Sequence, residues 1–458
     1  MQPEPTTRVP RRWRPAWLGT CAVLATAQVL QAGLIRLELS ASDPVVGADE
    51  RFMREVVEPN IRRHRQSEAV VAVVDAENHP MIGARFTLRQ TRQAFAFGCS
   101  LDHFVEPPAP SPEFKAPLVS PQQLERFKEV FNSSVIAYSA QWSVMEPQEG
   151  HPQFEDLDRY VAWCATNGIG LQFHFLSGCL PEWMKSKSAN ESQAAFLAHA
   201  QAMVARYGDR IRDWQVVDER YLLEQSPEVI RWFRTARPDL RLGIADCARF
   251  STGAETNGLR GLKDVSWLRE QGAPVDFFGF HGHRPFGLWA DPQTIYRSLD
   301  AFARENVRVF VTECGVPDRG PIVGSVRTGE WTPELQADYY RLFFRICFSH
   351  PAVDGVNLWG LGPRTWVRHA GLLDASFEPL PAFHALKRLI REEWMTRLGG
   401  ALPQNGRTTF RGFHGAYELA VTPRDGTETR VFTFELTPAV TNVLRFAWQD
   451  GSVVPRRE

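Results

Sequence analysis

The feature that most constrains the fold of this chain is an alternation of short apolar runs with longer amphipathic stretches. Eight apolar runs have the length and composition of buried strands, and the stretches between them have helical periodicity. Alternating strands and helices require a parallel sheet, and eight repeats favour a closed (β/α)8 barrel. The predicted strands are residues 95–98, 134–138, 171–175, 214–217, 242–245, 277–281, 307–312 and 355–358. The predicted helices include residues 121–131, 157–166, 192–207, 227–236, 292–305 and 333–348.

An open, doubly wound sheet is the alternative architecture for such an alternation. That fold binds nucleotides through a glycine-rich loop after a strand, and no such loop follows any of the eight runs. We therefore expect an α/β protein built on a (β/α)8 TIM barrel.

The segments that flank the barrel have β-strand patterns. Two β-prone runs, 70–74 and 84–88, enclose a turn-rich segment and predict a small N-terminal β unit. Two alternating runs, 417–422 and 429–436, predict a small C-terminal β module. Its expected role is structural packing, and the alternatives are a cap on the barrel or a partner-binding module. The expected regions are a signal peptide or membrane anchor (1–36), a linker and β unit (37–93), the barrel (94–396) and the β module (397–458).

The N-terminus has the pattern of an export signal. Four arginines (Arg8, Arg11, Arg12 and Arg14) precede an apolar run over residues 16–30. We expect the protein to be exported: periplasmic, secreted, or anchored to the outer face of a membrane through this segment. The alternative is a basic tail followed by a core helix.

Composition narrows the range of partners. A formal net charge of −1 gives no reason to expect nucleic acid. The 14 Trp and 30 Phe include candidate platforms for the apolar faces of sugar rings. The seven cysteines form no CxxC pair, so neither a zinc cluster nor a disulfide framework is indicated. We expect a monomer.

Polar and aromatic residues collect at the predicted strand ends, where active sites of such barrels lie. Cleavage of a glycosidic bond requires two carboxyl groups, one to protonate the leaving oxygen and one on the other side of the anomeric carbon. Glu219 and Glu313 each follow a predicted strand, the fourth and the seventh. They are the candidate catalytic pair.

Within residues 131–150 the chain has Phe131-Asn132, Gln141-Trp142 and Glu146-Pro147 followed by Gly150, and further motifs follow in order as far as Leu389. Together with residues from Phe95 onward, they resemble glycoside hydrolase family 10, a family of xylanases, whose signature here is phenylalanine-asparagine, lysine-tryptophan and glutamate-proline-x-x-glycine. Residues 216–219 resemble Val-Val-Asn-Glu, residues 279–283 resemble Gly-x-Gln-x-His, and residues 312–313 resemble Thr-Glu-x-Asp. His174, the Trp359-Gly360 pair and Trp366 match further family positions.

The resemblance implies a retaining glycoside hydrolase that cleaves β-1,4-linked polysaccharide, xylan or a related plant β-glycan, by double displacement. This reaction needs no metal or organic cofactor, so none is expected. It implies that Glu219 is the acid/base, that Glu313 is the nucleophile and that His283 orients Glu313. His174 would contact sugar hydroxyls, and Trp359 and Trp366 would line the sugar subsites. The candidate substrate-binding residues are Tyr138, Gln141, Trp142, His174, Asp218, His281, His283, Trp359 and Trp366.

This chain departs from the family pattern around the sugar. Ala137, Tyr138 and Gln141 stand where the family has Glu, Asn and Lys, and Asp218 stands where it has Asn. Gly315 replaces the Asp two residues after the nucleophile. These changes affect substrate contacts more than the two Glu residues.

Two other functions remain open on the sequence. The first is a non-catalytic carbohydrate-binding barrel, which the lost polar contacts favour and the retained Glu pair opposes. The second is a metal-dependent hydrolase using His281 and His283, which lie two residues apart on a strand and so point to the same side. The sequence shows no independent carboxylate ligand for such a metal.

Overall fold

The computed structural model describes residues 45–107, 115–174, 176–246, 254–283, 286–324, 326–426, 428–438 and 442–448. The predicted signal or anchor segment (1–36) lies outside these residues. Among the helices described, none is both long and apolar enough to span a membrane.

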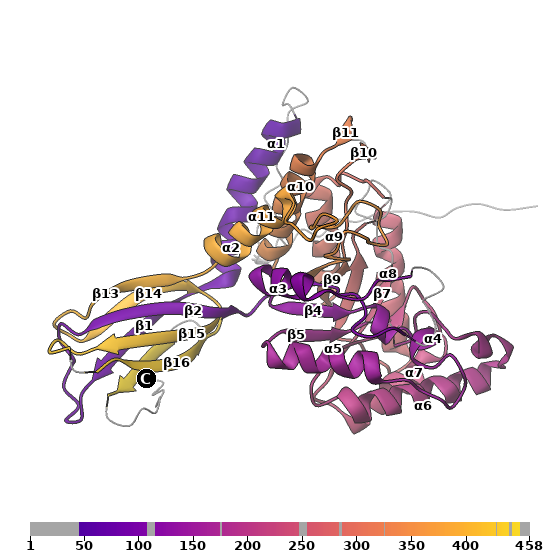
Figure 1. The fold of residues 1–458 in the computed structure, drawn as a ribbon, viewed down its shortest axis with the longest axis horizontal. Coiled ribbons are helices and arrows are strands. Elements are labelled where there is room, and N and C mark those ends of the chain that lie inside the picture. The colour runs from indigo at the N-terminus through magenta and orange to yellow at the C-terminus, as the bar shows by residue number, and fades with distance from the viewer. Residues whose placement is uncertain are drawn as a thin grey trace, which may run out of the picture. The chain divides into compact units, whose positions relative to one another are not determined.

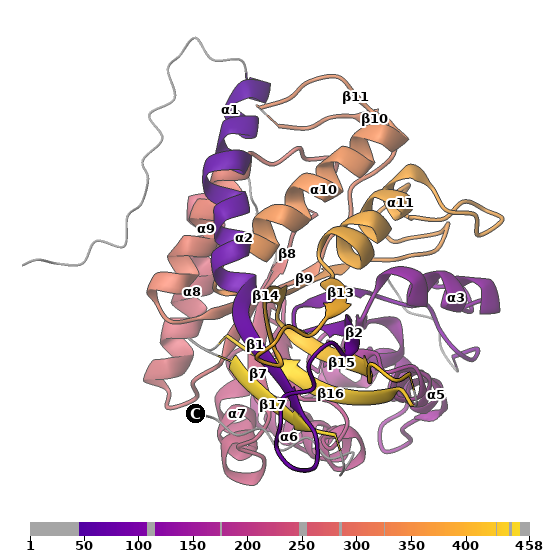
Figure 2. The same ribbon diagram turned by 90° about the vertical axis from the view of Figure 1, so that its left-hand side faces the viewer.

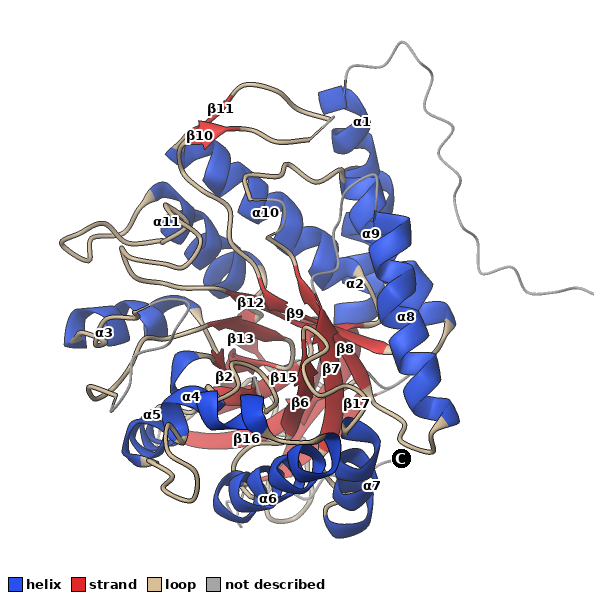
Figure 3. Ribbon diagram, turned by 90° about the vertical axis from the view of Figure 1, so that its right-hand side faces the viewer, coloured by secondary structure: helices blue, strands red, loops and turns tan. Residues whose placement is uncertain are grey.

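Eight parallel strands form a closed barrel, in the spatial order β12-β3-β4-β5-β6-β7-β8-β9. Figure 3 shows these strands at the centre, with helices outside them. The predicted (β/α)8 barrel is therefore confirmed, and each predicted strand overlaps an observed one. The strands are β3 (Ala96–Cys99), β4 (Ser133–Ile136), β5 (Gly170–Phe173), β6 (Asp213–Asp218), β7 (Arg241–Asp246), β8 (Phe277–His281), β9 (Arg308–Glu313) and β12 (Val353–Leu358).

The outer helices begin where the sequence supplies capping residues. The side chains of Ser120, Asp291 and Thr332 each accept a hydrogen bond from a backbone N–H in the first turn, and a proline follows each of them. Ser188 forms a reciprocal capping box with Glu191. The helices are α3 (Pro121–Val130), α4 (Trp142–Met145), α5 (Glu155–Thr166), α6 (Ala189–Tyr207), α7 (Ser226–Ala236), α8 (Ala254–Glu270), α9 (Pro292–Arg304), α10 (Pro333–Ser349) and α11 (Pro381–Arg388).

The strands of the two flanking segments pair with one another in two further sheets. One sheet has the order β14-β1-β17 and the other the order β13-β2-β15-β16. Figure 1 shows the indigo strands β1 and β2 among the yellow C-terminal strands. The strands are β1 (Gln66–Val74), β2 (Arg85–Gln93), β13 (Arg397–Ala401), β14 (Arg407–Phe413), β15 (Gly415–Thr422), β16 (Arg430–Leu436) and β17 (Asn442–Ala447).

These two sheets share one apolar core. Val71 of the first sheet and Leu88, Leu419 and Phe432 of the second belong to the same buried cluster. Burial alternates residue by residue along β15, as expected for a strand with one face in a core. The N-terminal unit and the C-terminal module expected from the sequence thus contribute to the same pair of sheets. Local patterns predict strands, but not which distant strand each one pairs with.

Helix α2 (Glu58–Arg65) runs directly into β1 (Figure 2) and its last residue contacts the barrel. The guanidinium of Arg65 donates hydrogen bonds to the carbonyl oxygens of Phe348 and His350, both at 2.6 Å, and to that of Val353 at 2.8 Å. Arg65 thereby connects the end of α2 to the end of α10 and the start of β12.

A buried histidine packs beneath α4. The ring of His199, on α6, stacks on Trp142 with centroids 4.2 Å apart and an angle of 12° between the ring planes. Burial lowers the pKa of His199 to about 3, so the ring is neutral near pH 7. Trp142 is itself 1 % exposed, which places it in the core.

We predict that replacing Gly243 of β7 by Ala lowers the free energy of unfolding by about 1–3 kcal/mol, because the barrel there is close-packed. A Cβ atom at position 243 would lie 2.2 Å from Cε2 of Phe277, a fully buried ring that packs against Phe310. Gly170→Ala is the control, because its Cβ would find its nearest neighbour at 3.6 Å. Equal stabilities of the two variants in denaturant unfolding would contradict this packing.

His199 should make the stability of the protein depend on pH. Its folded pKa of about 3 lies below the value of about 6.5 expected for an unfolded chain. Its contribution is therefore fully present above pH 6.5 and is lost as the pH falls towards 3, by up to about 3 kcal/mol at pH 4. Chemical denaturation at pH 7 and pH 4 should show a smaller loss for His199→Phe than for the wild type. The same loss in both proteins would refute the assignment.

Candidate active site

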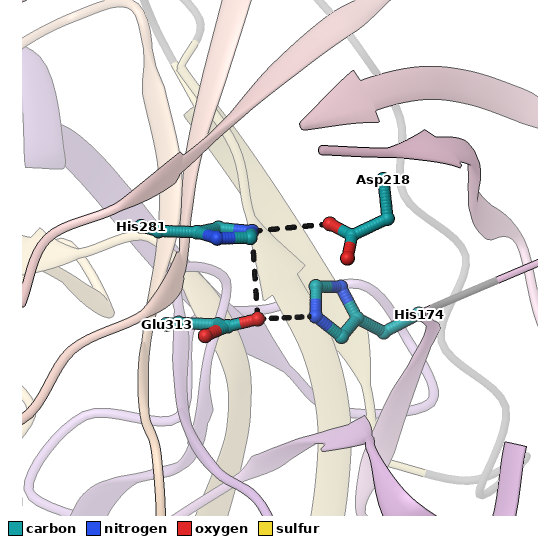
Figure 4. A group of neighbouring side chains, drawn as sticks. All are labelled: His174, Asp218, His281 and Glu313. Atoms are coloured by element: carbon teal, nitrogen blue, oxygen red, sulfur yellow. Dashed lines mark hydrogen bonds and ion pairs between the residues drawn. The ribbon is translucent and has the colours of Figure 1, made fainter. Parts of the chain in front are cut away.

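Side chains predicted to be functional gather at the carboxyl ends of four barrel strands. His174 follows β5, Asp218 ends β6, His281 ends β8 and Glu313 ends β9. Each of these residues is at most 4 % exposed. Figure 4 shows their side chains converging. Because parallel strands of a barrel all end at the same mouth, residues far apart in the sequence become neighbours here.

Glu313 is the centre of this group and contacts three imidazole rings. Its Oε1 lies 2.8 Å from Nε2 of His174 and 3.4 Å from Nε2 of His281. Its Oε2 lies 3.4 Å from Nε2 of His283. The Nε2 atom of His281 also lies 3.2 Å from Oδ1 of Asp218, so this ring bridges the two carboxylates.

An irregularity in the strand register aligns His281 with Glu313. Phe280 lies opposite Val311, but the next residue, His281, lies opposite Glu313. Thr312 is thus an extra residue on β9, as in a β-bulge, and such bulges re-aim side chains next to active sites. The bulge places the carboxylate beside the imidazole.

A second bulge shapes the end of β6. Gln215 lies opposite Gly243, whereas Val217 lies opposite Ile244, so Val216 is the extra residue. In a regular strand, residues three apart point to opposite faces. Across this bulge the Nε2 amide of Gln215 instead donates a hydrogen bond to Oδ1 of Asp218 at 2.8 Å.

Gln215 was not predicted as a site residue. It is fully buried, and its Oε1 lies 2.7 Å from Nδ1 of His174, so it holds both His174 and Asp218. The sequence did carry a signal for Gln215, which is a lone amide in an otherwise apolar predicted strand. Buried polar groups in proteins are almost always hydrogen-bonded, so such an amide indicates polar partners nearby. Ser177 was also missed, and its Oγ accepts a hydrogen bond from the backbone N–H of Asp218 at 3.3 Å.

The surroundings of the two buried carboxylates act on their pKa values in opposite directions. Burial alone would raise the pKa of Glu313, but the adjacent imidazoles of His281, His174 and His283 lower it to about 2. Burial raises the pKa of Asp218, against the lowering influence of His281 and His174. Glu313 is therefore the group that carries the negative charge most firmly.

Glu219 lies next to this cluster on a strained backbone. Its φ is +42°, and Arg220 and Leu222 also have positive φ, a conformation that costs non-glycine residues about 1–3 kcal/mol each. Oε1 of Glu219 lies 3.7 Å from Nδ1 of His281, and the side chain is 30 % exposed. Arg220 forms an ion pair with Asp264. The loop after β6 thus brings Glu219 to the other nitrogen of the ring that contacts Glu313.

The predicted aromatic residues fall into two groups. Trp359 packs against His174 and Tyr138, and Trp366 packs against His283, so these rings adjoin the carboxylate cluster. Trp359 and Tyr138 are buried, whereas Trp366 is partly exposed. Trp142 instead packs in the core against His199, and Gln141, also buried, directly precedes α4.

Four of these residues have the composition of a metal-binding site. His174, Asp218, His281 and Glu313 each offer one nitrogen or oxygen ligand atom, and these atoms all lie within 4.8 Å of one another. The metal hypothesis from the sequence paired His281 with His283. In the structure His174 completes the group instead, and two carboxylates, which the sequence did not reveal as ligands, accompany the two imidazoles.

Comparison with known proteins agrees with this architecture. Residues 113–389 match glycosyl hydrolase family 10. Anti-sigma-I factor RsgI6 of Acetivibrio thermocellus is 26 % identical over 379 residues, which cover 79 % of this chain and 46 % of that protein. Endo-1,4-beta-xylanase B of Thermotoga neapolitana is 26 % identical over 303 residues, which cover 60 % of this chain and 85 % of the xylanase.

Solved structures share the barrel fold. The structure of native xylanase 10B from Thermotoga maritima superimposes with a TM-score of 0.53 at 21 % identity, covering 66 % of this chain and 96 % of that one. The present chain spans about half the length of the anti-sigma factor. Since the family match extends over more than half of the 458 residues, the chain belongs to glycosyl hydrolase family 10.

Proposed function

We propose that this protein is a retaining glycoside hydrolase that cleaves β-1,4-linked polysaccharide of the xylan type. The proposal rests on the positions of Glu219 and Glu313, which contact different nitrogen atoms of the His281 ring. Glu313 lies at the end of β9 and Glu219 directly after β6, within 3.4 Å and 3.7 Å of the two nitrogens of His281. Family membership and the similarity to xylanases support the same reaction class.

The environments of the two glutamates suit different roles. Glu313 is buried, and its lowered pKa keeps it ionised, as a nucleophile requires. Glu219 is partly exposed, where it can exchange protons with water. In the proposed double displacement, Glu219 protonates the leaving oxygen while Glu313 attacks the anomeric carbon. Glu219 then takes a proton from the water that releases the sugar from Glu313.

The substrate proposal is xylan or a related plant β-glycan. Trp366, which keeps part of its indole exposed beside His283, is suited to stack on a sugar ring. Ala137 and Tyr138 are buried with Trp359 where the family pattern has polar sugar-binding residues. Charged hydrogen bonds contribute about 1.5–3 kcal/mol each, so their loss favours a sugar or a substitution pattern other than plain xylose.

Recognition of a glycan without turnover is the second candidate function. One observation favours it: the His281 imidazole lies between the two glutamates, where the family pattern has a neutral glutamine. One of the relatives described above, anti-sigma-I factor RsgI6, is named as an anti-sigma factor and not as a hydrolase. Retained binding of xylo-oligosaccharides without release of reducing ends would select this candidate.

We also propose that the protein is exported, on the basis of the four arginines and the apolar run at residues 16–30. Cell fractionation should place the protein outside the cytosol. Recovery of all active protein from the cytosol with Met1 intact would contradict export.

Glu219→Gln should lower kcat/KM on xylan by about 10²–10⁴-fold, because the leaving oxygen loses its proton donor. Release of reducing ends from xylan and from a panel of other β-glycans measures the effect and the substrate preference. An aryl xylobioside with an acidic phenol should be much less sensitive to the substitution, because its leaving group needs no protonation. Glu224→Gln, an exposed carboxyl on the same loop, is the matched control. An equal loss on both substrates would show that Glu219 is not the acid.

A further inference from the structure

The buried cluster at the barrel mouth has the geometry of a metal site. Adjacent ligand atoms of His174, Asp218, His281 and Glu313 are separated by 2.8, 3.2 and 3.4 Å. In a tetrahedral zinc site with bonds of about 2.0–2.1 Å, ligand atoms lie about 3.3 Å apart. The four side chains come from four different strands, so the barrel itself holds them at these separations.

The orientation of His174 provides an independent argument. The amide N–H of Gln215 donates to Asp218, so the amide oxygen of Gln215 faces Nδ1 of His174 and accepts its proton. In a neutral imidazole, the Nε2 atom then carries the lone pair, and this atom lies 2.8 Å from the carboxylate of Glu313. The contact between this nitrogen and the carboxylate oxygen of Glu313 is favourable only where a proton or a metal cation lies between the two atoms. A hydrogen bond to the non-ligating nitrogen is also the usual way in which proteins orient a metal-bound histidine.

The two buried carboxylates of the cluster also favour a bound cation. Asp218 and Glu313 are both buried at 4 % exposure, and burying two carboxylates together is costly unless positive charge balances them. A divalent cation supplies that charge at one point, in contact with both oxygens. Neutral imidazole nitrogen and carboxylate oxygen are ligands that zinc and similar divalent metals accept.

Two of the four ligands are departures from the family pattern. Asp218 stands where the pattern has Asn, and His281 stands where it has Gln. Each substitution replaces a neutral amide by a better metal ligand, an anionic carboxylate in one case and an imidazole in the other. The set of two imidazoles and two carboxylates is thus completed by two residues that differ from the family pattern.

We propose that His174, Asp218, His281 and Glu313 bind a divalent transition-metal cation of the zinc type. The proposal goes beyond glycoside hydrolysis and does not depend on it. A cation at this position would bind Oε1 of Glu313 and draw negative charge from the carboxylate, which would then be a weaker nucleophile towards a sugar. Metal occupancy would therefore hold the proposed hydrolase in an inactive state.

Titration calorimetry with zinc chloride on the full, chelator-treated protein tests the proposal. We expect one tight site per chain in the wild type. Asp218→Asn combined with His281→Gln should weaken that site by more than about 100-fold, because two ligands are removed and loss of a supporting residue alone costs 10–100-fold. Both substitutions restore residues of the family pattern, so the barrel should still fold, which thermal unfolding checks.

Two control variants distinguish this site from other zinc ligands. His79→Ala removes one member of the exposed group Asp75, Glu77 and His79, and should leave the tight site intact. His283→Gln, which removes a contact to Glu313 but none of the four ligands, should weaken zinc binding by about 10-fold, less than the double variant does. Loss of the tight site in His79→Ala would place the binding elsewhere and overturn the proposal.

Equal zinc affinity in the wild type and the double variant would also overturn the proposal, and would assign the balancing charge to protons on the imidazoles. If zinc binds one-to-one but the metal-free protein hydrolyses no polysaccharide, the proposed hydrolysis fails and the metal site stands. If the metal-free protein is active but binds no zinc, the hydrolysis stands and the metal site fails.

Discussion

The negative charge of Glu313, buried at the mouth of the barrel, is the constraint on which the rest of the site depends. Three imidazoles from two other parts of the barrel surround it, at 2.8 to 3.4 Å. To reach these positions, β9 carries an extra residue opposite β8, and β6 carries one opposite β7. The local irregularities of the strands are thus explained by the need to bring histidines and carboxylates together.

The rest of the barrel holds this arrangement rigid. Its strands are buried on both faces, and tight contacts such as that between Gly243 and Phe277 leave little room for adjustment. Gln215 fixes His174 and Asp218 through a single amide whose two ends have different partners. One buried side chain therefore constrains the orientations of both an imidazole and a carboxylate of the site.

The two proposed uses of the site compete for one carboxylate. Double displacement needs an oxygen of Glu313 to attack an anomeric carbon, whereas a bound cation would draw negative charge away from the same carboxylate. The family pattern, with Asn and Gln in place of Asp218 and His281, offers amides that suit a sugar better than a metal. In these proposals, two side chains on one fold decide between the two chemistries.

By itself, the sequence determined the barrel and the candidate catalytic pair. Strands and helices follow from apolar periodicity, which is a local property, and Glu219 and Glu313 directly follow strand patterns. Only the tertiary structure decided the pairing of β1 and β2 with C-terminal strands, the burial of Trp142 against His199, and the role of Gln215. Each of these depends on contacts between residues far apart in the chain or on a bulge of one residue. A single extra residue reverses the direction of every side chain after it, and no local pattern records where it occurs.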